Sequence, residues 1–229
     1  MMRLLVSVRS VDEALLAAGA GADFIDCKEP GHGALGGLPV ASITAIVGAL
    51  RRQRVSLPVS ATIGDLPMHA LGDILSRVDA VGACGVDYVK VGITREPTAS
   101  VVLDVLARCG AAVVPVFIAD RGLDEALVVR AAALGFPALM ADTADKRAGS
   151  LFDAVPVAAL RRFIAAARAA GALVGLAGAL RQSHAMALAD LAPDFAGFRS
   201  AVCLGGRSEA LDASCLRDLI DAMRPVAPA

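Results

Sequence analysis

One pattern recurs along the whole chain: a short apolar run, a turn, and then a longer segment whose apolar residues have helical spacing. The short runs predict strands at residues 3–8, 24–28, 58–63, 88–92, 112–118, 138–142, 173–177 and 195–199. The longer segments predict helices at residues 11–18, 40–52, 70–84, 98–109, 123–134, 156–170, 181–190 and 212–223. Strands that alternate with helices pair in parallel. Eight such units in 229 residues predict an α/β fold of the (β/α)8 or TIM barrel type, forming a single domain over residues 1–229.

A doubly wound open sheet is the other arrangement in which strands and helices alternate. That fold usually carries a glycine-rich phosphate loop directly after its first strand. The residues in that place here, Val8-Arg9-Ser10, do not form such a loop. The barrel is therefore the better interpretation.

The composition argues against several classes of function. The chain has a net charge of −1 and only 3% aromatic residues, so it lacks the basic surface and the stacking side chains of a nucleic-acid-binding protein. Its apolar runs are short, and its first residues do not resemble a signal peptide, so we expect no membrane segment and a cytoplasmic location. The five cysteines form no CxxC pair and the three histidines lie far apart, so we expect no disulfide and no metal.

Lysine is scarce: only Lys28, Lys90 and Lys146 occur among the 22 basic residues, and the others are arginine. All three lie at or just beyond the ends of predicted strands, on the side of a barrel where active sites are built. Arginine stays protonated, whereas lysine loses its proton when its surroundings lower its pKa. The pattern predicts a reactive amine that forms a Schiff base with a carbonyl substrate. Lys28 is the favoured nucleophile, and Lys90 and Lys146 are its rivals.

Two carboxylates accompany these lysines. Asp26 lies two residues before Lys28, so both side chains point to the same face of the strand. Asp142 lies four residues before Lys146. We expect both aspartates to move protons during formation and breakdown of an imine. The other interpretation is a set of ion pairs at the barrel rim that contribute little to stability.

Small residues follow the seventh and eighth predicted strands, where barrels often bind phosphate through backbone N–H groups. The candidate phosphate-binding residues are Gly178, Ala179, Gly205, Gly206 and Arg207, with Arg199 as an alternative source of charge.

Three other features near the predicted strand ends have open roles. Ser60 and Thr62 on the third strand could contact substrate hydroxyls or shape a turn. The glycine-rich residues 31–37 could cap the site, hold a second phosphate or form a mobile loop. We expect Asp120, after the fifth strand, to cap a helix.

Several motifs in a fixed order resemble the (5-formylfuran-3-yl)methyl phosphate synthase family of methanofuran biosynthesis, and the likeness covers nearly the whole chain. The motifs that carry it are Asp26-Cys27-Lys28-Glu29-Pro30, Gly33-Ala34-Leu35-Gly36, Val89-Lys90-Val91-Gly92, Asp142-Thr143 with Lys146, and Gly178-Ala179-Leu180. The block on the second strand is the most specific of them.

The resemblance implies a (β/α)8 lyase that needs no cofactor. It would condense two glyceraldehyde 3-phosphates into (5-formylfuran-3-yl)methyl phosphate with loss of phosphate and water, as a carbon–oxygen lyase acting on phosphates. It also implies that Lys28 forms the Schiff base beside Asp26, and that Lys90, Asp142 and Lys146 supply acid–base and phosphate contacts.

Two other functions fit the residues alone: another Schiff-base aldolase or isomerase acting on sugar phosphates, or a barrel that binds sugar phosphates without catalysis. The chain is rich in aliphatic residues, so some helices should expose apolar faces, and we expect a homo-oligomer.

Overall fold

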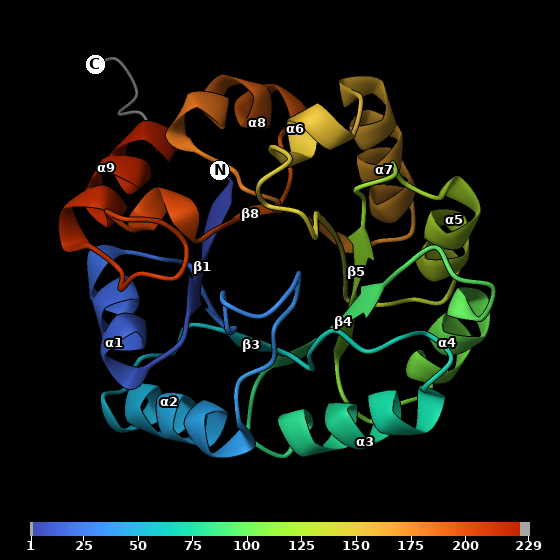
Figure 1. Cartoon of the computed structure of the whole chain (residues 1–229), viewed down its shortest axis with the longest axis horizontal. Coiled ribbons are helices and arrows are strands. Elements are labelled where there is room, and N and C mark those ends of the chain that lie inside the picture. The colour runs from blue at the N-terminus through green and yellow to red at the C-terminus, as the bar shows by residue number, and fades with distance from the viewer. Residues whose placement is uncertain (1, 225–229) are drawn as a thin grey trace.

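The computed structural model describes residues 2–224 and forms a closed barrel of parallel strands that neighbour one another in sequence order (Figure 1). The strands are β1 (Arg3–Val8), β2 (Phe24–Cys27), β3 (Val59–Thr62), β4 (Tyr88–Ile93), β5 (Val113–Ile118), β6 (Ala138–Asp142), β7 (Leu173–Leu176) and β8 (Phe195–Phe198). Pairing of β8 with β1 closes the sheet. The predicted (β/α)8 fold is confirmed, and each predicted strand matches an observed one to within a residue or so at either end.

Helices surround the barrel on the outside (Figure 1). They are α1 (Val11–Ala20), α2 (Val40–Arg52), α3 (Leu71–Gly82), α4 (Ala99–Leu106), α5 (Glu125–Ala133), α6 (Leu151–Ala154), α7 (Val157–Ala169), α8 (Ala185–Leu191) and α9 (Ala213–Met223), with short 3-10 turns η1 (Gln182–His184) and η2 (Ser200–Val202). The single turn α6 has no counterpart among the predicted helices, because four residues are too few to show a helical period. No helix within residues 2–224 has the length and apolar character needed to cross a membrane.

Alternation of side chains along the strands produces two separate apolar layers. The larger layer lies between the strands and the helices. The smaller fills the barrel interior, where the rings of Phe24 and Phe195 lie 5.5 Å apart between centroids. Farther along the same strands, toward their carboxyl ends, the inward positions become polar. The barrel therefore has an apolar floor and a polar mouth.

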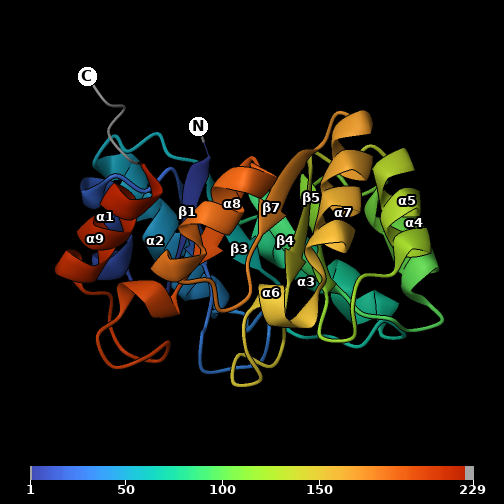
Figure 2. The same cartoon turned by 90° about the horizontal axis from the view of Figure 1, so that it is seen from above.

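The loops after β2, β6 and β8 extend from the same face of the barrel (Figure 2). The loop after β2 folds back over the mouth. Its Gly36 carbonyl accepts hydrogen bonds from Glu29 N at 2.8 Å and from the Thr62 hydroxyl at 2.9 Å. Asp65 accepts the N–H of Leu35 at 3.0 Å, and the Leu35 side chain is fully buried in the interior layer. The predicted glycine-rich run is thus a cap over part of the mouth.

We predict that Gly175→Ala destabilises the barrel, because a β-carbon at this inward position of β7 would overlap the Phe195 ring. Overpacking of this kind costs about 1–3 kcal/mol. The matched control is Gly19→Ala in α1, where the added methyl group meets nothing within 4 Å. It should stabilise the protein by about 0.5–1 kcal/mol. Urea unfolding measures both, and a midpoint for Gly175→Ala equal to that of the wild type contradicts the proposed packing.

Candidate active site

A pocket opens at the carboxyl ends of the strands, at the polar mouth of the barrel. The side chains of Lys28, Lys90, Asp142 and Lys146 line it, together with Gly178 and Arg207. None of its lining residues comes from β3 or β5. Leu35 fills that side, since one of its methyl groups lies 3.0 Å from the position that a β-carbon on Gly92 of β4 would take. The pocket is therefore restricted to one side of the mouth.

Asp26 is the centre of the first of two polar clusters. Its carboxylate accepts hydrogen bonds from the hydroxyls of Ser7 at 3.0 Å and Ser60 at 2.7 Å, and it forms an ion pair with Lys90 Nζ at 2.8 Å. The strand register explains this arrangement, because Ser7, Asp26 and Ser60 lie side by side on β1, β2 and β3. Asp26 and Lys90 are 1% and 2% exposed, so this pair lies at the bottom of the pocket and is almost completely shielded from bulk water.

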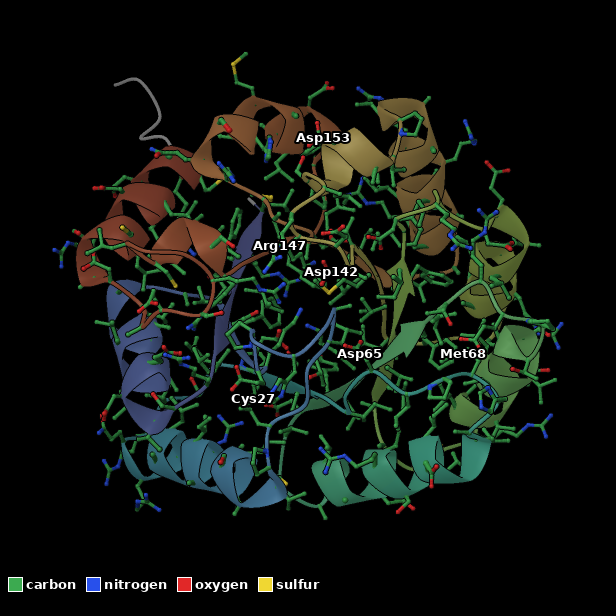
Figure 3. The ribbon with its side chains drawn as sticks, viewed as in Figure 1. Cys27, Asp65, Met68, Asp142, Arg147 and Asp153 are labelled. Carbon is green, nitrogen blue, oxygen red and sulfur yellow. The ribbon has the colours of Figure 1, made fainter. Side chains whose placement is uncertain are left out.

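Asp142, at the end of β6, is the centre of the second cluster and lies close to the barrel axis in the view down the barrel (Figure 3). Lys28 Nζ lies 3.3 Å from one of its oxygens. The ammonium group of Lys146 contacts the other oxygen, which also accepts the N–H of Thr143 at 2.7 Å. One carboxylate therefore lies between two lysines.

Burial opposes the charged form of Asp142, but the nearby ammonium groups of Lys28 and Lys146 outweigh it and hold the pKa of Asp142 well below its ordinary value. Burial also lowers the pKa of Lys146, with Asp142 opposing the shift and the charge of Lys28 adding to it. Lys146 thus gives up its proton more readily than a lysine in water. Burial likewise lowers the pKa of Arg207.

The pocket carries more positive than negative charge. Its lining includes three lysines and Arg207 against the two carboxylates of Asp26 and Asp142. Arg199 also lines the pocket, but its guanidinium is held by Glu13 of α1, at 2.6 and 3.1 Å. Arg207 rather than Arg199 therefore presents charge to a ligand, and an anionic ligand is the one this pocket suits.

The candidate phosphate residues divide into two groups. Gly178 and Ala179 line the pocket with left-handed backbone conformations, at φ 111° and 47°. A β-carbon on Gly178 would lie 2.9 Å from the hydroxyl of Thr143, so this loop packs closely on the Asp142 cluster. Gly205 and Gly206 belong to the same loop as Arg207 but do not line the pocket. Phosphate binding by all of these residues stays a prediction.

The candidate residues of β3 are both buried and already hydrogen-bonded. Ser60 donates to Asp26, and Thr62 donates to the Gly36 carbonyl under the cap. Substrate contact by Ser60 and Thr62 stays a prediction. The expectation that Asp120 caps a helix is wrong, because the side chain of Asp124 accepts the first N–H groups of α5 instead.

Sequence reasoning missed Ser7, and it named Thr143 only as part of a motif without giving it a role. Ser7 is the one hydroxyl in the apolar strand β1, and its parity with Leu5 already directs it into the barrel. Thr143 follows Asp142 directly and lies within 3.4 Å of Lys146 Nζ through its hydroxyl. Within residues 2–224, no group of three or more His, Cys, Asp or Glu side chains is arranged to hold a metal ion.

In sequence, this chain is similar to the members of one enzyme family. The family model described as 4-HFC-P synthase matches residues 4–220. A (5-formylfuran-3-yl)methyl phosphate synthase of Methanopyrus kandleri is 36% identical over 218 residues, which cover 89% of this chain and 90% of the relative. The synthase of that name from Archaeoglobus fulgidus is 32% identical over 97% of this chain and 99% of its own length.

Solved structures share the fold at much lower sequence identity. Phosphoribosyl anthranilate isomerase from Thermus thermophilus gives a TM-score of 0.67 at 18% identity, covering 97% of this chain and 98% of its own. A 3-hexulose-6-phosphate synthase gives a TM-score of 0.59 at 19% identity, covering 95% and 99%. These likenesses support the barrel.

We predict that Asp142→Asn costs about 3–5 kcal/mol at neutral pH, because it leaves the buried ammonium group of Lys28 and the partly buried one of Lys146 without their counter-ion. The pKa of Asp142 is depressed in the folded state. Its contribution is therefore complete above the unfolded value of about 3.9 and is lost as the pH falls below it. The variant should lack this part of the acid-induced loss of stability.

Urea unfolding of both proteins between pH 7 and pH 3 measures this difference. The control is Asp190→Asn, which breaks an exposed pair with Arg161 and should change the unfolding free energy little. An Asp142→Asn variant as stable as this control at neutral pH contradicts the prediction.

Proposed function

The chain belongs to the 4-HFC-P synthase family, and from this premise we propose that it joins two molecules of glyceraldehyde 3-phosphate into (5-formylfuran-3-yl)methyl phosphate, for methanofuran biosynthesis. In the balanced reaction one phosphate and two waters leave, which makes the protein a carbon–oxygen lyase. A cytoplasmic location and a homo-oligomeric state stay predictions.

A single observation carries this proposal: two buried lysines, a third lysine that is partly buried, and two buried carboxylates lie together at the mouth of the barrel. Burying so many charges opposes folding unless they pair or act. An amine, nearby proton carriers and a surplus of positive charge are the groups that imine chemistry on a phosphorylated carbonyl compound requires. The array therefore supports a lysine-dependent reaction of triose phosphates.

Lys28 is the nucleophile in this proposal. Its only ion pair among the described residues, with Asp142, is long at 3.3 Å, whereas Lys90 lies 2.8 Å from Asp26. Lys146 is in close contact with Asp142. Lys28 also lies just beyond the end of β2 and lines the pocket, so it is the ammonium group that is most readily released toward a bound carbonyl.

The first step consumes one amine and one carbonyl. Both molecules of glyceraldehyde 3-phosphate first isomerise to the ketone form. The neutral amine of Lys28 attacks the ketone carbon of one of them, and the carbinolamine loses its hydroxyl as water after receiving a proton. Lys146, whose pKa is lowered by burial, donates that proton. Asp142 stays ionised and holds the amines of Lys28 and Lys146 close together, since it contacts both.

Loss of a carbon-bound proton then converts the imine into an enamine that expels its phosphate group. The CH2 carbon left by that elimination attacks the ketone carbon of the second triose phosphate and forms the carbon–carbon bond of the branched product. Lys90 and Asp26, the other ion pair that lines the pocket, take up and return the carbon-bound proton. The free hydroxyl of the second triose closes the ring on the imine carbon, and loss of the Lys28 amine and of one water completes the furan. Together with the water lost in imine formation, two waters leave. Arg207, Gly178 and Ala179 hold the phosphate that is retained.

We predict that borohydride traps an adduct of wild-type protein and glyceraldehyde 3-phosphate, and that Lys28→Arg abolishes it, because arginine keeps its proton and cannot form the imine. Peptide mass spectrometry locates the adduct. The control is Lys146→Arg, which should keep the adduct on Lys28. An adduct found on Lys90 or Lys146 in the wild type identifies that lysine as the nucleophile instead of Lys28. The absence of any adduct contradicts the imine mechanism.

We also predict that purified protein releases inorganic phosphate from glyceraldehyde 3-phosphate and forms a product with furan absorption. Lys28→Arg should slow phosphate release on the order of a thousandfold or more. An aldolase would consume the same substrate without releasing phosphate. If carbon–carbon bonds form without phosphate release, the synthase proposal is wrong and the protein is an aldolase.

A further inference from the structure

Lys146 differs from the other two lysines in where its backbone lies. Lys90 belongs to strand β4 and Lys28 follows β2 directly, so the barrel itself fixes both. Lys146 lies four residues beyond the end of β6, in the loop that precedes α6. A side chain on a loop reaches a defined point only when something holds that loop in place.

The carboxylate of Asp120, in the loop after β5, holds the backbone immediately before Lys146. One of its oxygens accepts the N–H of Ala144 and the other accepts the N–H of Asp145, both at 2.7 Å. The side chain of Asp145 in turn accepts the N–H groups of Arg147 at 2.8 Å and Ala148 at 3.2 Å. The backbone is therefore fixed on both sides of Lys146.

The barrel places Asp120 where it can do this. Ile118, the last residue of β5, pairs in register with Asp142, and Ala119 N donates to the Asp142 carbonyl at 2.8 Å. Asp120 comes next, so its carboxylate faces the first turn of the loop after β6. Among the described residues Asp120 takes part in no ion pair, so both of its oxygens serve the loop.

These contacts support an inference that goes beyond the proposed function and that rests on it. We propose that Asp120 is a positioning residue for the reaction: it fixes the loop after β6 so that the ammonium group of Lys146 is directed onto Asp142. Asp120 does not line the pocket, so it acts through Lys146 and touches no substrate.

The first test is a double-mutant cycle on phosphate release from glyceraldehyde 3-phosphate, with Asp120→Ala and Lys146→Met alone and combined. Asp120→Ala should lower kcat/KM about 10- to 100-fold in the wild type, because misplacement of a catalytic group by an ångström has effects of this size. In the Lys146→Met background it should change the rate by less than about twofold. An equal loss in both backgrounds overturns the proposal.

The control is Asp124→Ala, which removes a neighbouring aspartate that also accepts two backbone N–H groups, at 3.1 and 3.2 Å, but at the start of α5. It should lower stability to a similar extent as Asp120→Ala and leave kcat/KM unchanged. If Asp124→Ala loses as much activity as Asp120→Ala, the effect comes from a general loss of protein stability, and the proposal is overturned.

A second test needs no catalytic activity and so stands apart from the proposed function. Reductive methylation with formaldehyde, followed by peptide mass spectrometry, reports the reactivity of each lysine. Asp120→Ala should speed methylation of Lys146 several-fold and leave Lys90 unchanged, and Asp124→Ala should change neither. Unchanged reactivity of Lys146 in Asp120→Ala overturns the positioning role. If the wild type releases no phosphate but Asp120→Ala still speeds methylation of Lys146, only the proposed function is overturned.

Discussion

The pairing of buried lysines with Asp26 and Asp142 is the interaction on which the rest of the site depends. Removing a single ammonium group from water opposes folding by several kcal/mol unless a close counter-ion compensates. Here each of two carboxylates supports one or two lysines, and serine hydroxyls and a backbone N–H satisfy the oxygens further. The same contacts that permit burial also place an amine beside its proton carriers.

Barrel closure supplies the precision of this pairing. Ser7, Asp26 and Ser60 meet because parallel strands in register bring equivalent inward positions side by side, although 34 residues separate Asp26 from Ser60. Asp142 meets Lys28 across the mouth over a separation of 114 residues. The loop after β6, which carries Lys146, lies outside this framework, and its geometry comes from side-chain hydrogen bonds.

The fold and the identity of the five charged candidate residues could be predicted from sequence, because hydrophobic period and lysine scarcity are local signals. Which carboxylate pairs with which lysine could not be. Lys28 follows Asp26 closely in sequence, yet its partner is Asp142, and Asp26 pairs with Lys90 instead. Such partners depend on the closed barrel. The role of Asp120 was hidden for the same reason, since the N–H groups it accepts belong to the next unit of the chain.

The surplus of positive charge at the mouth has a consequence for the turnover of the protein. A recess with more cations than carboxylates draws an anion from any solution that contains one. Phosphate, which the proposed reaction releases, is such an anion and competes with each new substrate molecule for Arg207 and its neighbours. Stronger attraction would speed capture of substrate but would also slow the departure of phosphate. The two carboxylates therefore do more than permit burial: their negative charge weakens the attraction of the mouth for anions.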